Sequence, residues 1–122
     1  MNNASRTGAA GEEFTADRLK QRGYRIVARN YRCRSGEIDL IARDGECLVF
    51  VEVRYRTDTG KGHPLETVDP RKQRRICKVS DVYRYHNHIG TDEPVRYDVV
   101  AVLGDELVHL ENAFPYLGAS AY

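Results

Sequence analysis

The sequence has few cysteines, and no two of them have the spacing of a redox or zinc motif. There are three, Cys33, Cys47 and Cys77, which is an odd number without a CxxC pair. A disulfide framework or a zinc knuckle is therefore not expected, and the pattern is typical of a protein of the reducing cytoplasm. We predict a cytoplasmic location and ordinary, partly buried thiols.

Long apolar runs and a strong charge imbalance are also lacking. No stretch is long and apolar enough to span a bilayer, so no membrane contact is predicted. The polar residues 1–6 carry no signal-peptide core, and we expect a frayed start. Net charge is only +1, although residues 1–78 carry 17 Lys and Arg against 11 Asp and Glu, and residues 79–122 carry 2 against 7. This asymmetry allows one basic face for a polyanion, unless folding scatters the charges.

Two common catalytic patterns are missing as well. Residues 60–62, Gly-Lys-Gly, lack the spacing of a phosphate-binding P-loop, so nucleoside triphosphate binding has no support. No Ser/His/Asp or Cys/His group can be assembled from the sequence.

The predicted helices divide the chain into simple parts. With 122 residues, 41% of them apolar, the chain suits a single domain (1–122) with a substantial core. One helix is expected near residues 8–22, ended by Gly23, and another from Asp69-Pro70 to about His86. Between them, residues 57–66 are glycine-rich and polar and predict a mobile loop. Residues 1–7 and 115–122 are predicted to be frayed or irregular.

Five strands are expected around these helices. They are predicted at residues 24–31, 36–42, 48–54 and 95–103, with a short edge strand at 107–110. The order is then α-β-β-β-α-β-β. Because a helix between the third and fourth strands permits a parallel crossover, we predict an α/β fold with a mixed sheet flanked by helices.

Two acidic residues interrupt otherwise apolar strands. Asp39 lies within 36–42 and Glu52 within 48–54, and Asp44-Gly45 between these strands is a strong turn signal. Strands this apolar are normally buried on both faces, where a carboxylate needs a cation or a partner. A two-residue Asp44-Gly45 loop would make Asp39 and Glu52 diagonal neighbours. It would also place four side chains on one face: Glu37, Asp39, Glu52 and Arg54.

Two interpretations of this acidic pair remain open. Two carboxylates suit a hard cation such as Mg²⁺ or Mn²⁺, which keeps several waters for a substrate phosphate. Alternatively, Asp39 or Glu52 forms a buried salt bridge with Arg54. A third carboxylate, that of Glu12, would favour the metal if its helix face packs on the sheet, whereas a rotated helix would leave Glu12 in solvent.

Basic residues of the second helix and of the loop before it form a candidate nucleic-acid surface. Cation–phosphate contacts dominate non-specific affinity for nucleic acids, although a run of cations is also typical of a solvated helix face. The candidate phosphate contacts are Arg56, Lys61, Arg71, Lys72 and Arg75, with Arg74 and Lys78 on the same helix.

These patterns resemble the PD-(D/E)xK nuclease superfamily, in which an Asp on one strand precedes Glu-x-Lys on the next and follows a helical Glu. Gly8-x-x-Gly11-Glu12 and the run Phe-Val-Glu-Val-Arg at 50–54 are similar to archaeal Holliday-junction resolvases. More closely, the chain resembles the uncharacterised bacterial YraN-like family. The matching segments, which cover nearly the whole chain, are 11–12, 22–24, 36–41, 50–54, Lys72 with 75–76, and 96–100.

The resemblance implies a restriction-endonuclease-like, three-layer fold and a divalent-metal-dependent endonuclease that acts on DNA, including branched DNA. Asp39 and Glu52 would bind Mg²⁺ or Mn²⁺ together with the backbone carbonyl of Val53. Glu12 and the residue at position 54 would complete the catalytic set, with Glu37 in a supporting place. Relatives with this fold often form dimers, so the resemblance also allows a homodimer.

Position 54 departs from the superfamily pattern because it is Arg rather than Lys. Arginine stays protonated in proteins, so Arg54 can stabilise charge on a phosphate but cannot act as a base. A second hypothesis is therefore a nucleic-acid-binding module that keeps the nuclease fold without turnover. A third is a protein-interaction domain whose acidic pocket is vestigial.

Overall fold

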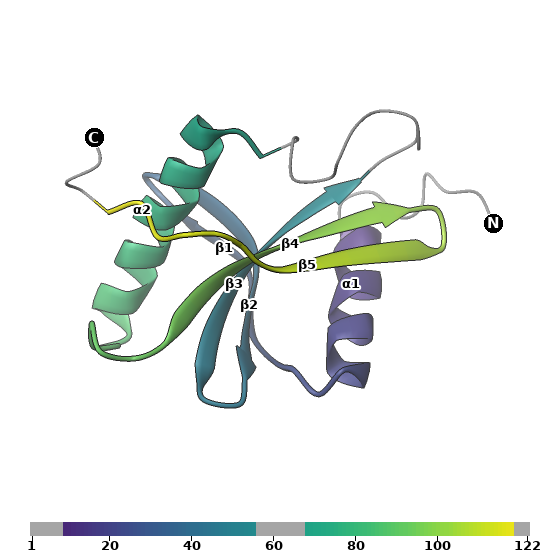
Figure 1. Ribbon diagram of the computed structural model, residues 1–122, viewed down its shortest axis with the longest axis horizontal. Coiled ribbons are helices and arrows are strands. Elements are labelled where there is room, and N and C mark those ends of the chain that lie inside the picture. Colours follow the sequence, from purple (N-terminus) through teal and green to yellow (C-terminus); the bar gives the residue numbers. More distant parts are fainter. Residues whose placement is uncertain (1–8, 56–67, 119–122) are drawn as a thin grey trace.

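The computed structural model of the chain describes residues 9–55 and 68–118. Two helices, α1 (Ala9–Gln21) and α2 (Pro70–His86), lie on opposite sides of one sheet (Figure 1). The five strands are β1 (Arg25–Cys33), β2 (Gly36–Asp44), β3 (Cys47–Tyr55), β4 (Val95–Leu103) and β5 (Glu106–Phe114). The predicted α/β class and the order α-β-β-β-α-β-β are confirmed.

The sheet is mixed, as predicted. Its strand order is β1-β2-β3-β4-β5, so each strand neighbours the next one along the chain. β3 and β4 are parallel and are connected through α2, whereas the other three pairs are antiparallel. A parallel pair needs such a crossover, and a helix in the crossover covers one face of the sheet.

The ends of both helices follow the local sequence signals. Gly23, with φ of +96°, follows α1, and the Tyr24 N–H donates to the Leu19 carbonyl at 3.0 Å. Asp69 caps α2 by accepting a hydrogen bond from the Lys72 N–H at 2.8 Å, and Pro70 opens the helix. Within the described residues, neither helix is long and apolar enough to cross a membrane.

β5 is longer than the predicted strand at 107–110. Its pairing with β4 is interrupted between Tyr97 and Val99 and then resumes, because Asn112 adopts φ of +53° and forms a bulge. The bulge interrupts the alternation of apolar and polar residues, so the sequence does not identify the part of β5 beyond residue 110 as a strand. Residues 115–118 have no regular secondary structure, as expected. The predictions for 1–7, for 57–66 and for 119–122 lie outside the described residues.

The core has two layers, one on each face of the sheet. The layer under α2 contains Ile41, Phe50, Ile76, Val79, Tyr83 and Tyr97. The layer under α1 contains Ala16, Leu19, Leu40, Val51, Val53 and Val100. Alternate residues of β3 enter opposite layers, which explains its nearly continuous apolar sequence. The three cysteines are free thiols, with Cys77 buried and the other two half-buried, as predicted.

The register of the β2–β3 hairpin differs from the prediction. Asp44 pairs with Cys47, and Gly45-Glu46 forms the two-residue turn, with Gly45 at φ of +60°. The Asp-Gly signal was therefore placed one residue too early, because the glycine occupies the first central position of the turn. Ile41, rather than Asp39, pairs with Phe50. The same register, extended by one pair beyond Leu40 and Val51, would bring Asp39 opposite Glu52.

The regular alternation on which the prediction for the acidic side chains rests does not run through the whole of β2. Ile38 and Ile41 both pack in the layer under α2, although they are three residues apart. The regular alternation is therefore interrupted between them, at Asp39. The neighbouring strand is irregular at the same level, because Asn30 adopts φ of +50°. Asp39 is thus free of the constraint that strand alternation places on its neighbours.

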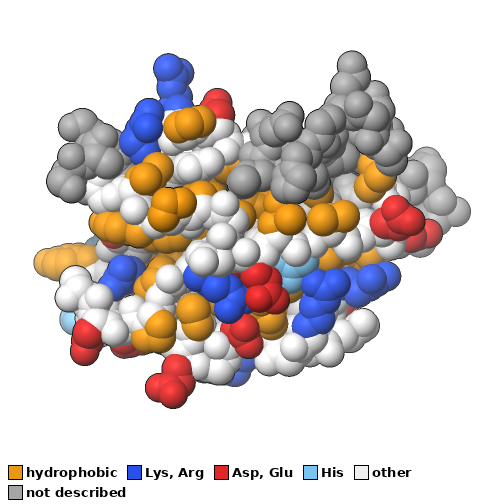
Figure 2. All heavy atoms as spheres, in the orientation of Figure 1, with side chains coloured by type: hydrophobic (Ala, Val, Ile, Leu, Met, Phe, Trp, Pro, Cys, Tyr) orange, Lys and Arg blue, Asp and Glu red, His pale blue; other side chains and the backbone are white. Residues whose placement is uncertain are grey.

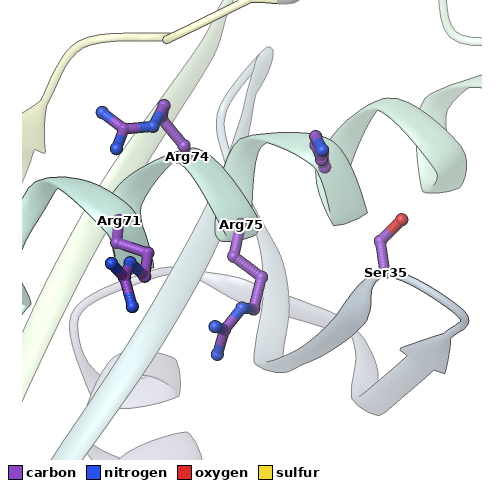
Figure 3. A pocket seen from close by; sticks show the side chains of 5 residues that line it. Ser35, Arg71, Arg74 and Arg75 are labelled. Atoms are coloured by element: carbon purple, nitrogen blue, oxygen red, sulfur yellow. The ribbon is translucent and has the colours of Figure 1, made fainter. Parts of the chain in front are cut away.

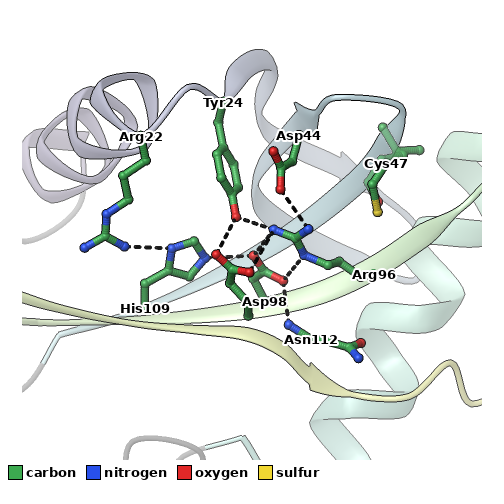
Figure 4. Close-up of polar contacts among 10 residues, drawn as sticks. Arg22, Tyr24, Asp44, Cys47, Arg96, Asp98, His109 and Asn112 are labelled. Atoms are coloured by element: carbon green, nitrogen blue, oxygen red, sulfur yellow. Dashed lines mark hydrogen bonds and ion pairs between the residues drawn. The ribbon is translucent and has the colours of Figure 1, made fainter.

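A buried polar network joins the end of α1 to β4 and β5 (Figure 4). Its centre is Asp98 of β4, whose side chain is fully buried. Arg96 Nε donates to Asp98 Oδ1 at 3.0 Å, His109 Nε2 contacts Oδ2 at 2.7 Å, and the Asn112 N–H donates to Oδ1 at 2.9 Å. Burial alone would raise the pKa of Asp98, but these hydrogen bonds and the Arg96 charge outweigh it and hold the pKa below its ordinary value.

His109 and Arg96 extend this network to α1. Arg22 Nη1 lies 2.9 Å from His109 Nδ1. A guanidinium only donates, so Nδ1 accepts and the ring proton on Nε2 is donated to Asp98. Arg96 also donates to Tyr24 Oη. The network therefore fixes the C-terminal end of α1 against the β4–β5 hairpin.

Asp98→Asn should destabilise the fold, because it removes the fully buried carboxylate that Arg96 and His109 contact. Among the carboxylates of the described residues, Arg96 then keeps only the more exposed ones of Asp44 and Glu111. Removing one partner of a buried charge pair costs on the order of 3 kcal/mol. We expect a lower midpoint of urea denaturation with an unchanged slope. Because the folded pKa of Asp98 is depressed, this stabilisation is present above its ordinary pKa of 3.8 and is lost only as the pH falls through the folded value.

The matched control is Glu111→Gln. The Glu111 carboxylate is exposed and lies 3.9 Å from Arg96 Nη2, so its charge should contribute less than about 1 kcal/mol. Equal denaturation midpoints for the wild type and Asp98→Asn would contradict the role given to the network.

Candidate metal and nucleic-acid site

The candidate site lies where β2 and β3 part. The described ladder between these strands runs from Asp44 and Cys47 to Leu40 and Val51. At the next position, Asp39 Oδ2 accepts a hydrogen bond from the Val53 N–H at 2.8 Å. A side-chain carboxylate thus takes the place that a strand carbonyl would occupy in a continuing ladder.

Asp39 is in unfavourable surroundings for a negative charge. Its pKa is raised from 3.8 to about 7, first by burial and then by the charges of Glu52, Glu12 and Glu37, against the opposing effect of the Val53 hydrogen bond. No Lys or Arg of the described chain forms an ion pair with it. Asp39 is therefore a half-buried carboxyl group that has no counter-charge within the described residues.

Glu52, by contrast, has two cationic partners. It is only 5% exposed, and its Oε2 lies 3.1 Å from Arg54 Nη1 and 3.7 Å from Lys72 Nζ. Burial raises the pKa of Glu52, while the charges and hydrogen bonds of Lys72 and Arg54 act in the opposite direction. The salt-bridge interpretation of the sequence thus holds for Glu52, and it does not hold for Asp39.

Lys72 belongs to this site, a contact that the sequence analysis missed. The sequence predicts Lys72 only as a phosphate contact on the helix surface. The Asp69 cap binds the Lys72 N–H and fixes the first turn of α2, from which the Lys72 side chain reaches Glu52. The capping signal Asp69-Pro70 places Lys72 in that first turn, but the path from β3 into α2 is needed to bring it to Glu52.

Glu12, Glu37 and Tyr55 surround Asp39 more loosely. α1 packs with Ala16 and Leu19 fully buried, as predicted, and Glu12 is half-buried. Burial, followed by the charges of Glu12 and Asp39, raises the pKa of Tyr55. Glu37 lies 3.3 Å from Arg32 Nε and still acts on Asp39 through its charge.

The chemistry of these donors fits a hard cation. Among residues 9–55 and 68–118, no three His, Cys, Asp or Glu side chains come together to hold a metal by themselves. The ligand set that the sequence implies is smaller, with two carboxylates, Asp39 and Glu52, and the Val53 carbonyl. Oxygen ligands of this kind suit Mg²⁺ or Mn²⁺, which keep part of their water shell. A cation there would supply the counter-charge that Asp39 lacks.

Basic side chains gather beside this acidic site. Lys and Arg side chains stand over the first turns of α2 at the top of the molecule in Figure 2. A cavity of about 230 Å³ there is lined by Arg54, Asp69, Arg71, Lys72 and Arg75, so it contains both cationic partners of Glu52. The structure thus brings three of the predicted phosphate contacts to the site. The other two, Arg56 and Lys61, lie outside the described residues.

Comparison with known proteins places the chain in a family. The pattern of Uncharacterised protein family UPF0102 matches residues 11–102, and the chain belongs to this family, which confirms the YraN-like resemblance. A UPF0102 protein of Lachnoclostridium phytofermentans is 46% identical over 92% of this chain and 95% of its own length. Those of Chlorobaculum parvum and Persephonella marina are 45% and 40% identical over 88% of this chain, and over 90% and 91% of their own lengths.

Asp39→Asn tests the unfavourable ionisation at the site. Because the folded pKa of Asp39 is about 7 and its ordinary value is 3.8, its ionisation lowers stability fully above pH 7 and not at all below pH 3.8. In a metal-free buffer near pH ~8, the substitution should raise the free energy of unfolding by roughly 2–4 kcal/mol, at ~1.4 kcal/mol per pKa unit. Urea denaturation should show this gain shrinking as the pH falls from 7 towards 4.

Asp69→Asn is the matched control, since Asp69 also accepts one backbone hydrogen bond at 2.8 Å but is exposed at a helix N-cap. Asn and Asp cap helices about equally well, so its stability should change little at either pH. A loss of stability at high pH in Asp39→Asn would contradict the account of the site.

Proposed function

We propose that this protein is a divalent-metal-dependent endonuclease-like protein that acts on phosphodiester bonds of DNA. The observation that carries the proposal is the arrangement around Glu52. Asp39 is a half-buried carboxyl group with no counter-charge within the described residues, and it lies next to Glu52, a carboxylate that holds a lysine and an arginine. Carboxylates that bind a cation and cations that bind a phosphate are the two components that phosphodiester hydrolysis requires.

The fold is consistent with this proposal. We infer a restriction-endonuclease-like fold of the PD-(D/E)xK superfamily from the mixed sheet between two helices and from the position of the acidic residues. Asp39 is on the second strand, Glu52 and Arg54 are on the third, and Glu12 is on the preceding helix. All four residues lie near the same end of the β2–β3 hairpin.

Each residue of the site would have a separate role in cleavage. Asp39, Glu52 and the Val53 carbonyl would hold the cation. When bound, Mg²⁺ or Mn²⁺ neutralises charge on the phosphate and lowers the pKa of a water molecule. Arg54 would stabilise the charge that develops on the phosphate, since its guanidinium keeps its proton. Lys72, which can exchange a proton, would take the role of the lysine that position 54 lacks.

Cleavage assays test the proposal directly. Branched, single-stranded and duplex DNA should be cleaved by the wild type in Mn²⁺ or Mg²⁺ and not in a chelator. Asp39→Ala should lower the rate by about 100-fold or more, because loss of a metal ligand removes both ligand charge and geometry. Arg25→Ala should keep the wild-type rate. It removes an exposed cation of β1, which pairs with β2 at the end of that strand far from Asp39. Equal rates for the wild type and Asp39→Ala would refute the assignment of the site.

Lys72→Arg separates charge from proton exchange. It keeps a cation beside Glu52 but replaces a group that can lose a proton with one that does not. We expect a fall in the maximal cleavage rate of about tenfold or more, within the range for a general acid or base, with little change in DNA affinity. If Lys72→Arg and the wild type give the same rate at every pH, Lys72 acts only through its charge.

A second candidate function is DNA binding without cleavage. It is favoured by one observation, the ion pairs that Glu52 already makes with Arg54 and Lys72, which leave that carboxylate less available to a metal. Calorimetric titration with Mn²⁺ distinguishes the two functions. Heat of binding in the wild type that is absent in Asp39→Ala supports the nuclease, and DNA binding without metal binding supports the module.

A further inference from the structure

A second basic cavity lies next to the first, farther along α2. It has a volume of about 250 Å³ and is lined by Ser35, Arg71, Arg74, Arg75 and Lys78. We call it the Ser35 cavity. Arg71 and Arg75 also line the cavity beside Glu52, so the two cavities share a wall. A strand that has one phosphate in the cavity beside Glu52 can therefore place the next group in the Ser35 cavity.

The charge of the Ser35 cavity is unusually one-sided. Its lining residues comprise four cations and one hydroxyl group, whereas the cavity beside Glu52 includes the carboxylate of Asp69. Within the described chain, no carboxylate forms an ion pair with Arg71 or Arg75. Figure 3 shows that these two side chains extend from the same side of α2. Two guanidiniums with available donors therefore face a small cavity without a negative charge of its own.

The backbone holds one of these guanidiniums in place. Gly36, the first residue of β2, has φ of +144°, and a Cβ at that position would lie 3.2 Å from both Cγ and Cδ of Arg75. The aliphatic stem of Arg75 thus lies against a backbone that only glycine leaves open. Arg75 lines both cavities. This arrangement orders Arg75 before any ligand binds, which lowers the entropic cost of binding.

We propose that the Ser35 cavity binds the terminal phosphate of a nucleic-acid strand. This inference rests on the proposed function, because it takes the ligand to be a nucleic acid. An internal phosphodiester carries one negative charge, whereas a terminal phosphate carries about −1.5 to −2 at neutral pH and offers three acceptor oxygens. Four cations and a hydroxyl group match the terminal phosphate better. A cavity of about 250 Å³ also suits a phosphate group rather than a drug-sized ligand.

The inference defines the substrate more narrowly than the site at Glu52 does. A strand end held in the Ser35 cavity places the reactive phosphodiester close to that end, because residues 71 and 78 span only about 10 Å along the helix. The protein would then prefer nicked, gapped or free strand ends over uninterrupted duplex.

Binding of short oligonucleotides tests the terminal phosphate. One sequence with an internal fluorophore is prepared with a 5′-phosphate, with a 3′-phosphate, or with hydroxyl groups at both ends. A chelator in the buffer prevents cleavage. Fluorescence anisotropy at low salt then gives the dissociation constants of the three forms. We expect one phosphorylated form to bind about tenfold more tightly than the hydroxyl form, as a few charge-assisted hydrogen bonds predict. Inorganic phosphate should compete with that form and not with the hydroxyl form.

Variants assign the preference to the cavity. Ser35 and Lys78 line only the Ser35 cavity. Ser35→Ala should lower the preference for the phosphorylated end and leave binding of the hydroxyl form unchanged. Lys78→Ala removes a cation of the nucleic-acid surface, so it should weaken the phosphorylated form more than the hydroxyl form. Arg75→Ala should weaken all three forms, because Arg75 lines both cavities. Arg25→Ala is the control for the loss of one surface cation and should change neither quantity.

Each failure has a different meaning. Equal affinity of the wild type for all three forms overturns the terminal-phosphate inference and leaves DNA binding intact. A preference that survives both Ser35→Ala and Lys78→Ala overturns its assignment to this cavity. If none of the oligonucleotides binds at low salt, the proposed function itself fails.

Discussion

The hydrogen bond from the Val53 N–H to the Asp39 carboxylate determines the arrangement of the site. It forms where the β2–β3 ladder ends and where the alternation of β2 is interrupted. The interruption frees Asp39 from the apolar layers, and the hydrogen bond gives its carboxylate one defined position. Glu52 and Arg54 then extend from the continuing strand, and α2 adds Lys72 from the other direction.

Both carboxylates of the site have a raised pKa, but their surroundings differ. Glu52 is neutralised by cations that the chain supplies, whereas Asp39 is left with a pKa raised to about 7 by burial and by its acidic neighbours. The fold therefore disfavours ionisation at both groups, and the shift is large at Asp39. Such local instability is common at functional sites, where selection acts on chemistry rather than on stability.

The sequence was sufficient for features that depend on neighbouring residues. The Asp69 cap, the Gly23 helix end and the element order all depend on local signals, and the structure confirms them. The hairpin register, by contrast, depended on which turn position the glycine of Asp44-Gly45 takes, and both positions suit glycine. The contact between Lys72 and Glu52 depends on the packing of α2 onto the sheet, which no local pattern encodes. The Asp98 network was missed for the same reason, since it joins α1, β4 and β5.

The two asparagines with positive φ have a consequence for the surface of the sheet. β1 and β5 are its outer strands, and each carries an exposed apolar residue, Val27 at 38% and Val108 at 48% exposure. Flat, apolar outer strands are templates for fibre-like association between chains. Asn30 in β1 and Asn112 in β5 each interrupt the extended backbone of their strand. The irregularity at Asn30 lies beside Asp39, and the Asn112 N–H binds Asp98. Both irregularities thus also protect the outer strands of the sheet against aggregation.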